Sequence, residues 1–361
     1  MTFVRVPVAT DPPYDVVIGD EAVVALRPLL DGVGQVALVS NPAVAAHADA
    51  VAIYLKTCGP QVMRIEVPDG EAAKDLRVAH HVWAAMGQAA FTRTDLVVGV
   101  GGGAVTDVTG FAAATWLRGV PVVHVPTTLL GMVDAAIGGK VAINTAAGKN
   151  LVGAFHQPEL VVVDPSYLAT LDQADYVAGL AEVVKAGFIA DPEILSVIES
   201  DVVAVLARMP DVVTDLVTRA VRVKASVVAA DPTEAGRRMV LNYGHTLAHA
   251  IEHDAGYGAW RHGDAVSVGL VYAAAVARRR RFGALDGETA DRHRAILESL
   301  GLPTRYAADA WPRLRAAMRT DKKSRGDRLR FVVLDALAQP SVLDSPNEAL
   351  LESAYEEVAQ A

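Results

Sequence analysis

Residues 96–107 read Leu96-Val-Val-Gly99-Val-Gly101-Gly102-Gly103-Ala104-Val-Thr-Asp107. The segment begins as an uninterrupted apolar run, passes through glycines and continues with helical spacing from Asp107 to Thr115. Apolar runs without polar alternation are typical of strands that are buried on both faces of a parallel sheet. Glycines at such a strand-to-helix turn let the backbone approach a pyrophosphate, which the free N–H groups of the helix start favour. The segment therefore predicts a parallel sheet with a candidate dinucleotide site.

This glycine turn leaves one alternative open. The pattern fits G-x-G-x-x-[GA], but no acidic residue lies about twenty positions further on, where a ribose contact is expected. A tight turn without a ligand is the structural alternative.

The surrounding sequence extends the α/β prediction. Further strand-like runs lie at Val36–Ser40, Val122–Val125 and Leu160–Asp164, and residues Leu76–Gln88 have helical spacing. Strands that alternate with helices predict a doubly wound α/β layer.

From Ala178 onward the pattern becomes helical. Only 329–334 and the stretch up to Leu343 resemble late strands. The predicted helices span residues 177–189, 194–207, 212–230, 239–253 and 265–281.

Composition narrows the function class. The chain has 361 residues, of which 52% are hydrophobic, enough for two cores of about 150 residues each. Its formal charge of −9 disfavours a nucleic-acid partner. The single cysteine, Cys58, cannot form an internal disulfide, which fits a reducing compartment or a chain that needs no disulfide. Because no secretory signal and no apolar run of about 18 residues is present, we expect a soluble, cytoplasmic protein without a membrane partner.

Two further groups of residues suit chemistry. The glycine-rich stretch 125–158 carries Lys140, Asn144, Lys149 and Asn150, which suit an anion site in a loop, although solvated lysines are the alternative and no P-loop motif is matched. In the helical half, Glu182 and Lys185 are spaced i,i+3 and suit a surface ion pair as well as a site.

Three histidines, His245, His249 and His253, fall on one helical face. The spacing offers His245 and His249 as an i,i+4 metal pair with a carboxylate from elsewhere, although Thr246 stands where H-E-x-x-H requires glutamate. For any one of these histidines, a structural role is the alternative.

Taken together, the motifs resemble the 3-dehydroquinate synthase family of the sugar-phosphate cyclase superfamily, from about Pro68 to Leu334. The segments that carry the resemblance are 101–107, 110–119, 125–130, 138–140, 148–158, 179–187, 241–249 and 261–264.

The resemblance implies a Rossmann-like α/β domain at residues 1–176 and a mainly α-helical metal- and substrate-binding domain at residues 177–361. It implies a lyase that converts 3-deoxy-D-arabino-heptulosonate 7-phosphate (DAHP) into 3-dehydroquinate and phosphate in the shikimate pathway. The implied course is transient oxidation by NAD, phosphate elimination, reduction and an intramolecular aldol addition.

The resemblance also assigns the metal. A divalent cation, usually zinc and in some cases cobalt, is implied at Glu182, His245 and His262. His249 then becomes a substrate contact, which overrules the i,i+4 pair.

Cofactor and substrate contacts follow from the same resemblance. The implied NAD contacts are Asp69, Gly70, Glu71, Ala72, Ala73, Lys74, Gly102, Gly103, Ala104, Val105, Thr106, Asp107, Thr127, Thr128, Lys140, Lys149 and Thr170. The implied substrate contacts are Asp134, Lys140, Asn150, Lys185, Lys224, Arg238, Asn242 and His249, with Arg118 from the partner subunit of a homodimer and Lys322 or Lys323, of which we favour Lys323.

Two other functions are alternatives. An aminodehydroquinate synthase or another sugar-phosphate cyclase would share most of these motifs, although Lys224, Arg238, Asn242 and His249 favour a carboxylated substrate. A metal-dependent polyol dehydrogenase would share the glycine turn but release NADH stoichiometrically.

Overall fold

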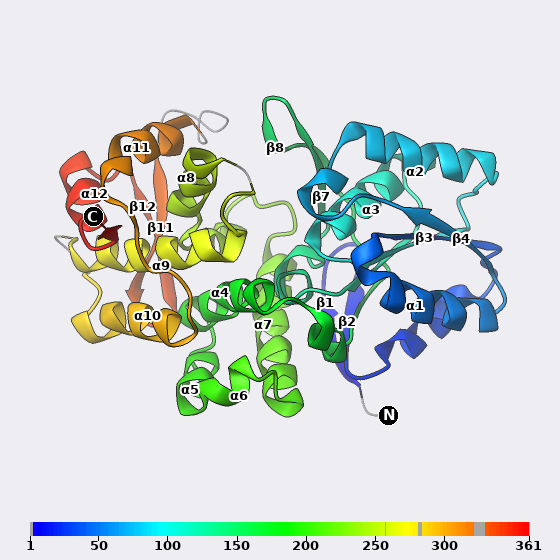
Figure 1. Ribbon diagram of the computed structural model, residues 1–361, viewed down its shortest axis with the longest axis horizontal. Helices are drawn as coiled ribbons and strands as arrows, with labels where there is room; N and C mark the ends of the chain where they lie inside the picture. The colour runs from blue at the N-terminus through cyan, green and yellow to red at the C-terminus, as the bar shows by residue number, and fades with distance from the viewer. Residues whose placement is uncertain (1–2, 257, 281–283, 321–328, 361) are drawn as a thin grey trace. The chain divides into compact units, whose positions relative to one another are not determined.

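The computed structural model describes residues 3–256, 258–280, 284–320 and 329–360 (Figure 1). Packing divides the chain into two compact units. Unit 1 contains the residues up to Leu171 together with Val213–Thr233, and unit 2 contains Asp172–Val212 and the residues from Glu234 onward. Residues 213–233 therefore pack in unit 1, although the sequence grouped them with the second domain. The domain boundary at residues 176–177 stays a prediction.

Unit 1 is built on a seven-stranded sheet with the order β1-β2-β9-β6-β5-β3-β4. All neighbouring pairs are parallel except the β1–β2 pair. The four predicted strands are confirmed as β3, β5, β6 and β9. The strands are β1 Val4–Val8, β2 Tyr14–Ile18, β3 Gln35–Ser40, β4 Gln61–Glu66, β5 Leu96–Gly101, β6 Val122–Pro126 and β9 Leu160–Val163.

The central strand β5 is buried on both faces, as its apolar run predicts. Val97 belongs to a core cluster with residues of α2 (Leu76–Gln88) and α3 (Gly103–Thr115). Val98 belongs to a second cluster with residues of α1 (Ala45–Thr57). The doubly wound arrangement is therefore confirmed. Helix α3 begins at Gly103 rather than at Asp107, so the glycine turn is shorter than the sequence suggests.

The strand order also marks a ligand position. The chain moves outward from β3 to β4 and then returns to the other side of β3 as β5. In open parallel sheets, ligands bind beyond the carboxyl ends of the strands at such a switch point. The glycine turn that follows β5 lies at this place.

The glycine-rich stretch contains a β-hairpin rather than only a loop, which corrects the sequence interpretation. Strands β7 (Lys140–Thr145) and β8 (Gly148–Phe155) pair antiparallel. Val141 and Ile143 pack into the core beside α3, where Gly110 leaves room for Val141. Because glycines and lysines interrupt its apolar pattern, the hairpin does not stand out in the sequence.

Unit 2 is mainly helical, as predicted, and holds the antiparallel pair β11 (Arg330–Ala336) and β12 (Gln339–Asp344), which confirms the late strands. The predicted helix 194–207 breaks at Asp201, whose side chain caps the next helix. The predicted helix 239–253 breaks at Gly244, which has a φ of +81°. The helices are α4 Gln173–Ile189, α5 Glu193–Ser200, α6 Val202–Leu206, α8 His245–Ala255, α9 His262–Arg278, α10 Gly287–Ser299, α11 Trp311–Thr320 and α12 Glu348–Tyr355, while α7 Pro210–Ala230 lies mostly in unit 1.

Helix α9 is the centre of unit 2, because it packs against α4, α8, α10 and α12 (Figure 1). Two glycines permit the closest contacts. A Cβ on Gly263 would lie 1.8 Å from the carbonyl oxygen of Ala178 in α4. A Cβ on Gly269 would lie 2.0 Å from the carbonyl oxygen of Gly244. Helix α9 is therefore held close to α4 at its start and close to the turn that precedes α8 about two turns later.

Every helix in the described ranges is too short or too polar to qualify as a candidate membrane span.

Candidate active site

Helix α4 carries a buried acidic side chain in unit 2. Glu182 is 3% exposed and forms an ion pair with Lys185, one turn further along the helix. Burial alone would raise the pKa of Glu182, but the charge of Lys185 and the neighbouring His245 and His262 hold that pKa well below its usual value. The carboxylate is therefore ionised. The i,i+3 spacing of Glu182 and Lys185 also suited a surface ion pair, but the structure shows that the pair is buried.

The first histidine of the site begins α8. His245 Nε2 lies 3.3 Å from Glu182 Oε1, and its Nδ1 donates a hydrogen bond to the backbone oxygen of Tyr243 at 3.1 Å. Burial, together with the charge of Lys185, lowers the pKa of His245 to about 4, although Glu182 acts in the opposite direction. The imidazole is neutral near pH 7, with its Nε2 lone pair directed toward Glu182.

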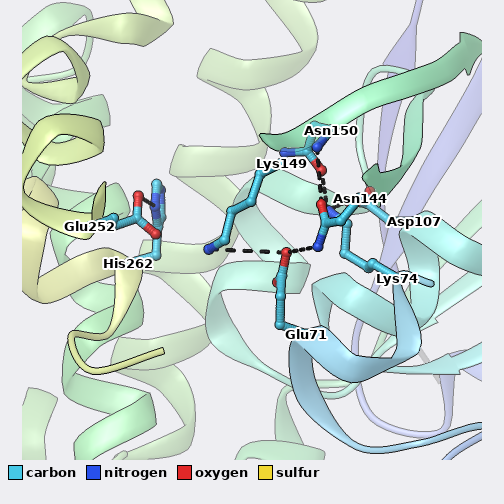
Figure 2. A network of polar contacts seen from close by, with 8 residues as sticks. All are labelled: Glu71, Lys74, Asp107, Asn144, Lys149, Asn150, Glu252 and His262. Carbon is cyan, nitrogen blue, oxygen red and sulfur yellow. Dashed lines mark hydrogen bonds and ion pairs between the residues drawn. The ribbon is translucent and has the colours of Figure 1, made fainter. Parts of the chain in front are cut away.

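The second histidine begins α9. His262 Nε2 lies 3.6 Å from Glu182 Oε1, and Nδ1 donates to Glu252 Oε2 at 3.2 Å (Figure 2). Burial would lower the pKa of His262, but its contacts with Glu182 and Glu252 outweigh that effect and raise the pKa to about 10. Without a metal ion, His262 therefore carries a positive charge between two carboxylates.

These side chains fit a divalent cation. One ligand atom from each of Glu182, His245 and His262 lies within 4.8 Å of the other two, and within the described ranges no other group of histidine, cysteine or acidic residues does so. Both Glu182 oxygens are buried and accept no hydrogen bond of normal geometry. Imidazole nitrogens with a carboxylate oxygen are a common catalytic zinc ligand set, which leaves a position open for substrate.

His249, the alternative ligand, lies beside this group. Its ring centre is 5.5 Å from that of His245 and 6.4 Å from that of His262. The set whose ligand atoms come together contains His262 instead. The spacing along one helix could not reveal this, because Glu182 and His262 come from other helices.

A polar cluster in unit 1 gathers several predicted cofactor contacts (Figure 2). The buried Lys74 amine donates to Asp107 Oδ2 at 2.5 Å and to Asn150 Oδ1. Asn144 Nδ2 donates to Glu71 Oε1 at 2.7 Å, and its side-chain oxygen accepts from the Asn150 backbone at 3.0 Å. Asn144 thus links Glu71 to Asn150, and it belongs to the glycine-rich stretch in which the sequence suggests an anion site.

Two more residues of this cluster have unusual surroundings. Burial raises the pKa of Asp107 to about 6, since Lys74 offsets only part of the burial effect. Lys149 Nζ lies 4.0 Å from Glu71 Oε1 on the other side of the cluster. The predicted contacts Glu71, Lys74, Asp107 and Lys149 therefore occupy one region of unit 1.

The glycine turn has features that fit a dinucleotide. A Cβ on Gly102 would lie 3.0 Å from Thr128 Cγ2, and one on Gly103 would lie 3.0 Å from Ala135 Cβ, so larger residues would fill this turn. Thr127 follows β6 and its buried hydroxyl has no hydrogen-bond partner. Buried polar groups without partners are rare, and a bound ligand is one explanation.

The remaining predicted residues are distributed over both units. In unit 1, Lys224 Nζ donates to Asp134 Oδ1 at 2.5 Å, and the Thr170 hydroxyl meets His47 Nε2 at 2.8 Å. In unit 2, Asn242 Nδ2 donates to Glu234 Oε1 at 3.0 Å, and Arg238 is buried.

Some predicted residues are exposed or fall outside the structure. Lys140 is exposed at the start of β7. Arg118 lies in a turn where Leu117, Arg118 and Gly119 all have positive φ. Lys322 and Lys323 lie outside the described residues.

Comparison with protein families gives two matches. Residues 64–178 match the 3-dehydroquinate synthase N-terminal model, and residues 179–324 match the 3-dehydroquinate synthase C-terminal model. A curated relative named 3-dehydroquinate synthase, from Mycolicibacterium gilvum, is 55% identical over 357 residues, which cover 99% of both chains.

Solved structures share the fold. A 2-epi-5-epi-valiolone synthase from Streptomyces hygroscopicus subsp. jinggangensis 5008, with NAD⁺ and Zn²⁺ bound, matches with a TM-score of 0.87 and 26% identity over 96% of each chain. A 2-deoxy-scyllo-inosose synthase complexed with carbaglucose-6-phosphate, NAD⁺ and Co²⁺ matches with a TM-score of 0.87 and 25% identity, over 99% of this chain and all of that one.

Proposed function

Because this chain belongs to the 3-dehydroquinate synthase family, we propose that it converts DAHP into 3-dehydroquinate and inorganic phosphate. The product is an intermediate of the shikimate pathway, which leads to the aromatic amino acids. The buried Glu182–His245–His262 group, in a chain with such relatives, is the observation that carries the proposal.

We assign a divalent metal to Glu182, His245 and His262, and NAD to the residues around the glycine turn. When bound, the metal polarises a substrate hydroxyl and NAD accepts and returns a hydride. Glu182 contributes a fixed negative charge, and each histidine contributes its Nε2. The buried Lys185 amine lies beside Glu182, so it is placed to keep the carboxylate ionised and to stabilise negative charge on a substrate oxygen.

The substrate is an anionic sugar acid, and the proposed contacts suit its two charged ends. We assign the substrate carboxylate to Lys224 and Arg238, because a guanidinium can bond both carboxylate oxygens. We assign the phosphate to Asn150, Asn242, His249 and Arg118. Asp134 and Lys140 complete the proposed contacts, with Lys323 from outside the described residues.

The homodimer belongs to this proposal, and surface residues of unit 1 support it. Leu151 and Phe155 of β8 are 62% and 52% exposed, and Leu117 beside Arg118 is also exposed. Large apolar side chains that are exposed to this extent are typical of an interface. We also propose the cytoplasm as the location, because the chain has one cysteine and a role in biosynthesis.

We expect a double substitution, Leu151→Lys with Phe155→Lys, to convert the dimer to a monomer in analytical ultracentrifugation, since buried lysines at an interface are costly. The matched control is Ile53→Lys, an exposed apolar residue on α1. A double variant that sediments as the wild-type dimer would show that this surface is not the interface.

The raised pKa of His262 predicts proton release when metal binds. His262, with a pKa of about 10, is protonated at pH 7 and must lose its proton to offer Nε2. His245 and Glu182 release none, since both pKa values are lowered. We therefore expect about one proton per metal ion, against about a quarter of a proton for an ordinary histidine of pKa about 6.5.

Isothermal titration of metal-free protein at pH 7, in buffers of different ionisation enthalpy, measures this number. Metal affinity should rise with pH up to about 10. A release of a quarter of a proton or less would contradict the charged state of His262.

The proposed reaction is tested with purified protein, DAHP, a divalent metal and NAD at a small fraction of the substrate concentration. We expect phosphate release over many turnovers per NAD, with no net accumulation of NADH. Stoichiometric NADH would indicate a polyol dehydrogenase instead. Turnover of the amino analogue with no turnover of DAHP would indicate an aminodehydroquinate synthase, and no release with either substrate would refute the proposal.

A further inference from the structure

Glu252 is a buried carboxylate for which the proposed reaction has no role. It lies on α8, two turns after His245, so both side chains are on the same face of the helix. Glu252 Oε2 accepts the hydrogen bond from His262 Nδ1 at 3.2 Å, and only 9% of its side chain is exposed (Figure 2). Carboxylates are rarely buried without a specific partner.

The contact determines which nitrogen of His262 faces the site. Because a carboxylate accepts a hydrogen bond, Nδ1 keeps its proton when His262 becomes neutral, and the Nε2 lone pair is then left for a ligand bond. Nε2 is the atom that lies 3.6 Å from Glu182 Oε1. Glu252 therefore selects both the tautomer and the direction of the ring.

His245 is held in a different way, and the comparison indicates why His262 depends on a side chain. The Nδ1 of His245 donates to the Tyr243 backbone, and only 11% of the His245 side chain is exposed. His262 is the first residue of α9, and 28% of its side chain is exposed. Because packing restrains the His262 ring less, the orientation of this ring depends more on its hydrogen bond to Glu252.

We propose that Glu252 is a positioning residue of the metal site, which holds His262 with Nε2 toward the divalent cation. Helix α8 would then supply one ligand directly, through His245, and fix the other ligand through Glu252. A carboxylate that accepts the Nδ1–H hydrogen bond also makes Nε2 a stronger ligand for the metal. The inference rests on the metal assignment made under the proposed function.

The test measures metal affinity without substrate. Metal-free wild type, Glu252→Gln and Glu252→Ala are titrated with Zn²⁺ against a chelator of known affinity. Loss of a hydrogen-bond partner behind a ligating histidine weakens metal binding about 10- to 100-fold. We expect about 10-fold for Glu252→Gln, whose amide oxygen can still accept from Nδ1, and about 100-fold for Glu252→Ala.

The matched control is Asp254→Asn. Asp254 lies on the same helix, but it bonds to Tyr306 and Arg313 rather than to His262. This variant should keep the wild-type affinity for Zn²⁺ even if its melting temperature falls. The visible spectrum of the Co²⁺-loaded proteins gives a second readout, because a displaced imidazole changes the ligand field in the Glu252 variants and leaves the Asp254→Asn spectrum unchanged.

Wild-type Zn²⁺ affinity in a folded Glu252→Gln and a folded Glu252→Ala would overturn the inference. If Glu252→Ala does not fold, Glu252→Gln alone decides. Failure of the metal assignment looks different, since the wild type itself would then bind no Zn²⁺ in the same titration. Failure of the DAHP reaction with intact metal binding would leave the role of Glu252 standing.

Discussion

His262→Ala should lose the divalent metal while His249→Ala keeps it. The ligand atoms that lie together belong to Glu182, His245 and His262, and His262 is the ligand that α9 supplies. Removal of one of three protein ligands should weaken binding by more than the roughly 100-fold that is lost when only its hydrogen-bond partner is removed. Metal content after dialysis, measured by elemental analysis, reports this directly.

Turnover separates the two variants further. His262→Ala should have no measurable phosphate release from DAHP at ordinary metal concentrations. His249→Ala should retain its metal and lose activity through weaker substrate contacts, because His249 lies beside the ligands rather than among them. The opposite result, a metal-free His249→Ala and a metal-loaded His262→Ala, would favour the i,i+4 pair on α8.

Gly263→Ala should destabilise the protein strongly. The new Cβ would lie 1.8 Å from the Ala178 carbonyl oxygen, and a backbone atom cannot move aside as the end of a flexible side chain can. Helices α4 and α9 would have to separate, at a cost of about 3 kcal/mol or more. We expect the melting temperature to fall by about 6 °C or more. Because Gly263 follows His262, the affinity for Zn²⁺ should fall as well.

The matched control is Gly287→Ala, at the first position of α10. The space around Gly287 is open except for the distant end of the Arg278 side chain, at 4.0 Å. Alanine there should leave the stability unchanged or raise it by about 0.4–1 kcal/mol, because it restricts the unfolded chain. A Gly263→Ala protein that melts and binds Zn²⁺ like the wild type would show that α4 and α9 do not need this close contact.

The sheet was predictable only where burial is complete. Strand β5 is buried along its whole length and its sequence is a plain apolar run. Strand β4 lies at the edge of the sheet and exposes several residues, so no such run marks it. The β7–β8 hairpin carries the glycines and lysines of a candidate anion site, which obscure the alternation of a strand.

The site was predictable in part for a similar reason. Spacing along one helix suggests His245 with His249, whereas the observed group joins residues of three helices. Only the resemblance to a known family assigned His262. Glu252 was missed because a single glutamate carries no pattern of its own, whereas Asn144 was included in the candidate anion site of the glycine-rich stretch. For Glu252, the two-turn spacing from His245 was the available signal.

All three assigned metal ligands belong to unit 2, whereas the proposed NAD contacts belong to unit 1. The two binding equilibria can therefore be perturbed one at a time. Substitutions at Lys74 or Asp107 should change NAD affinity at constant Zn²⁺ affinity, and any departure from independence is a coupling free energy that a thermodynamic cycle can measure. A family with this division of tasks can alter its metal site by changes in one unit while the cofactor site of the other unit is inherited intact.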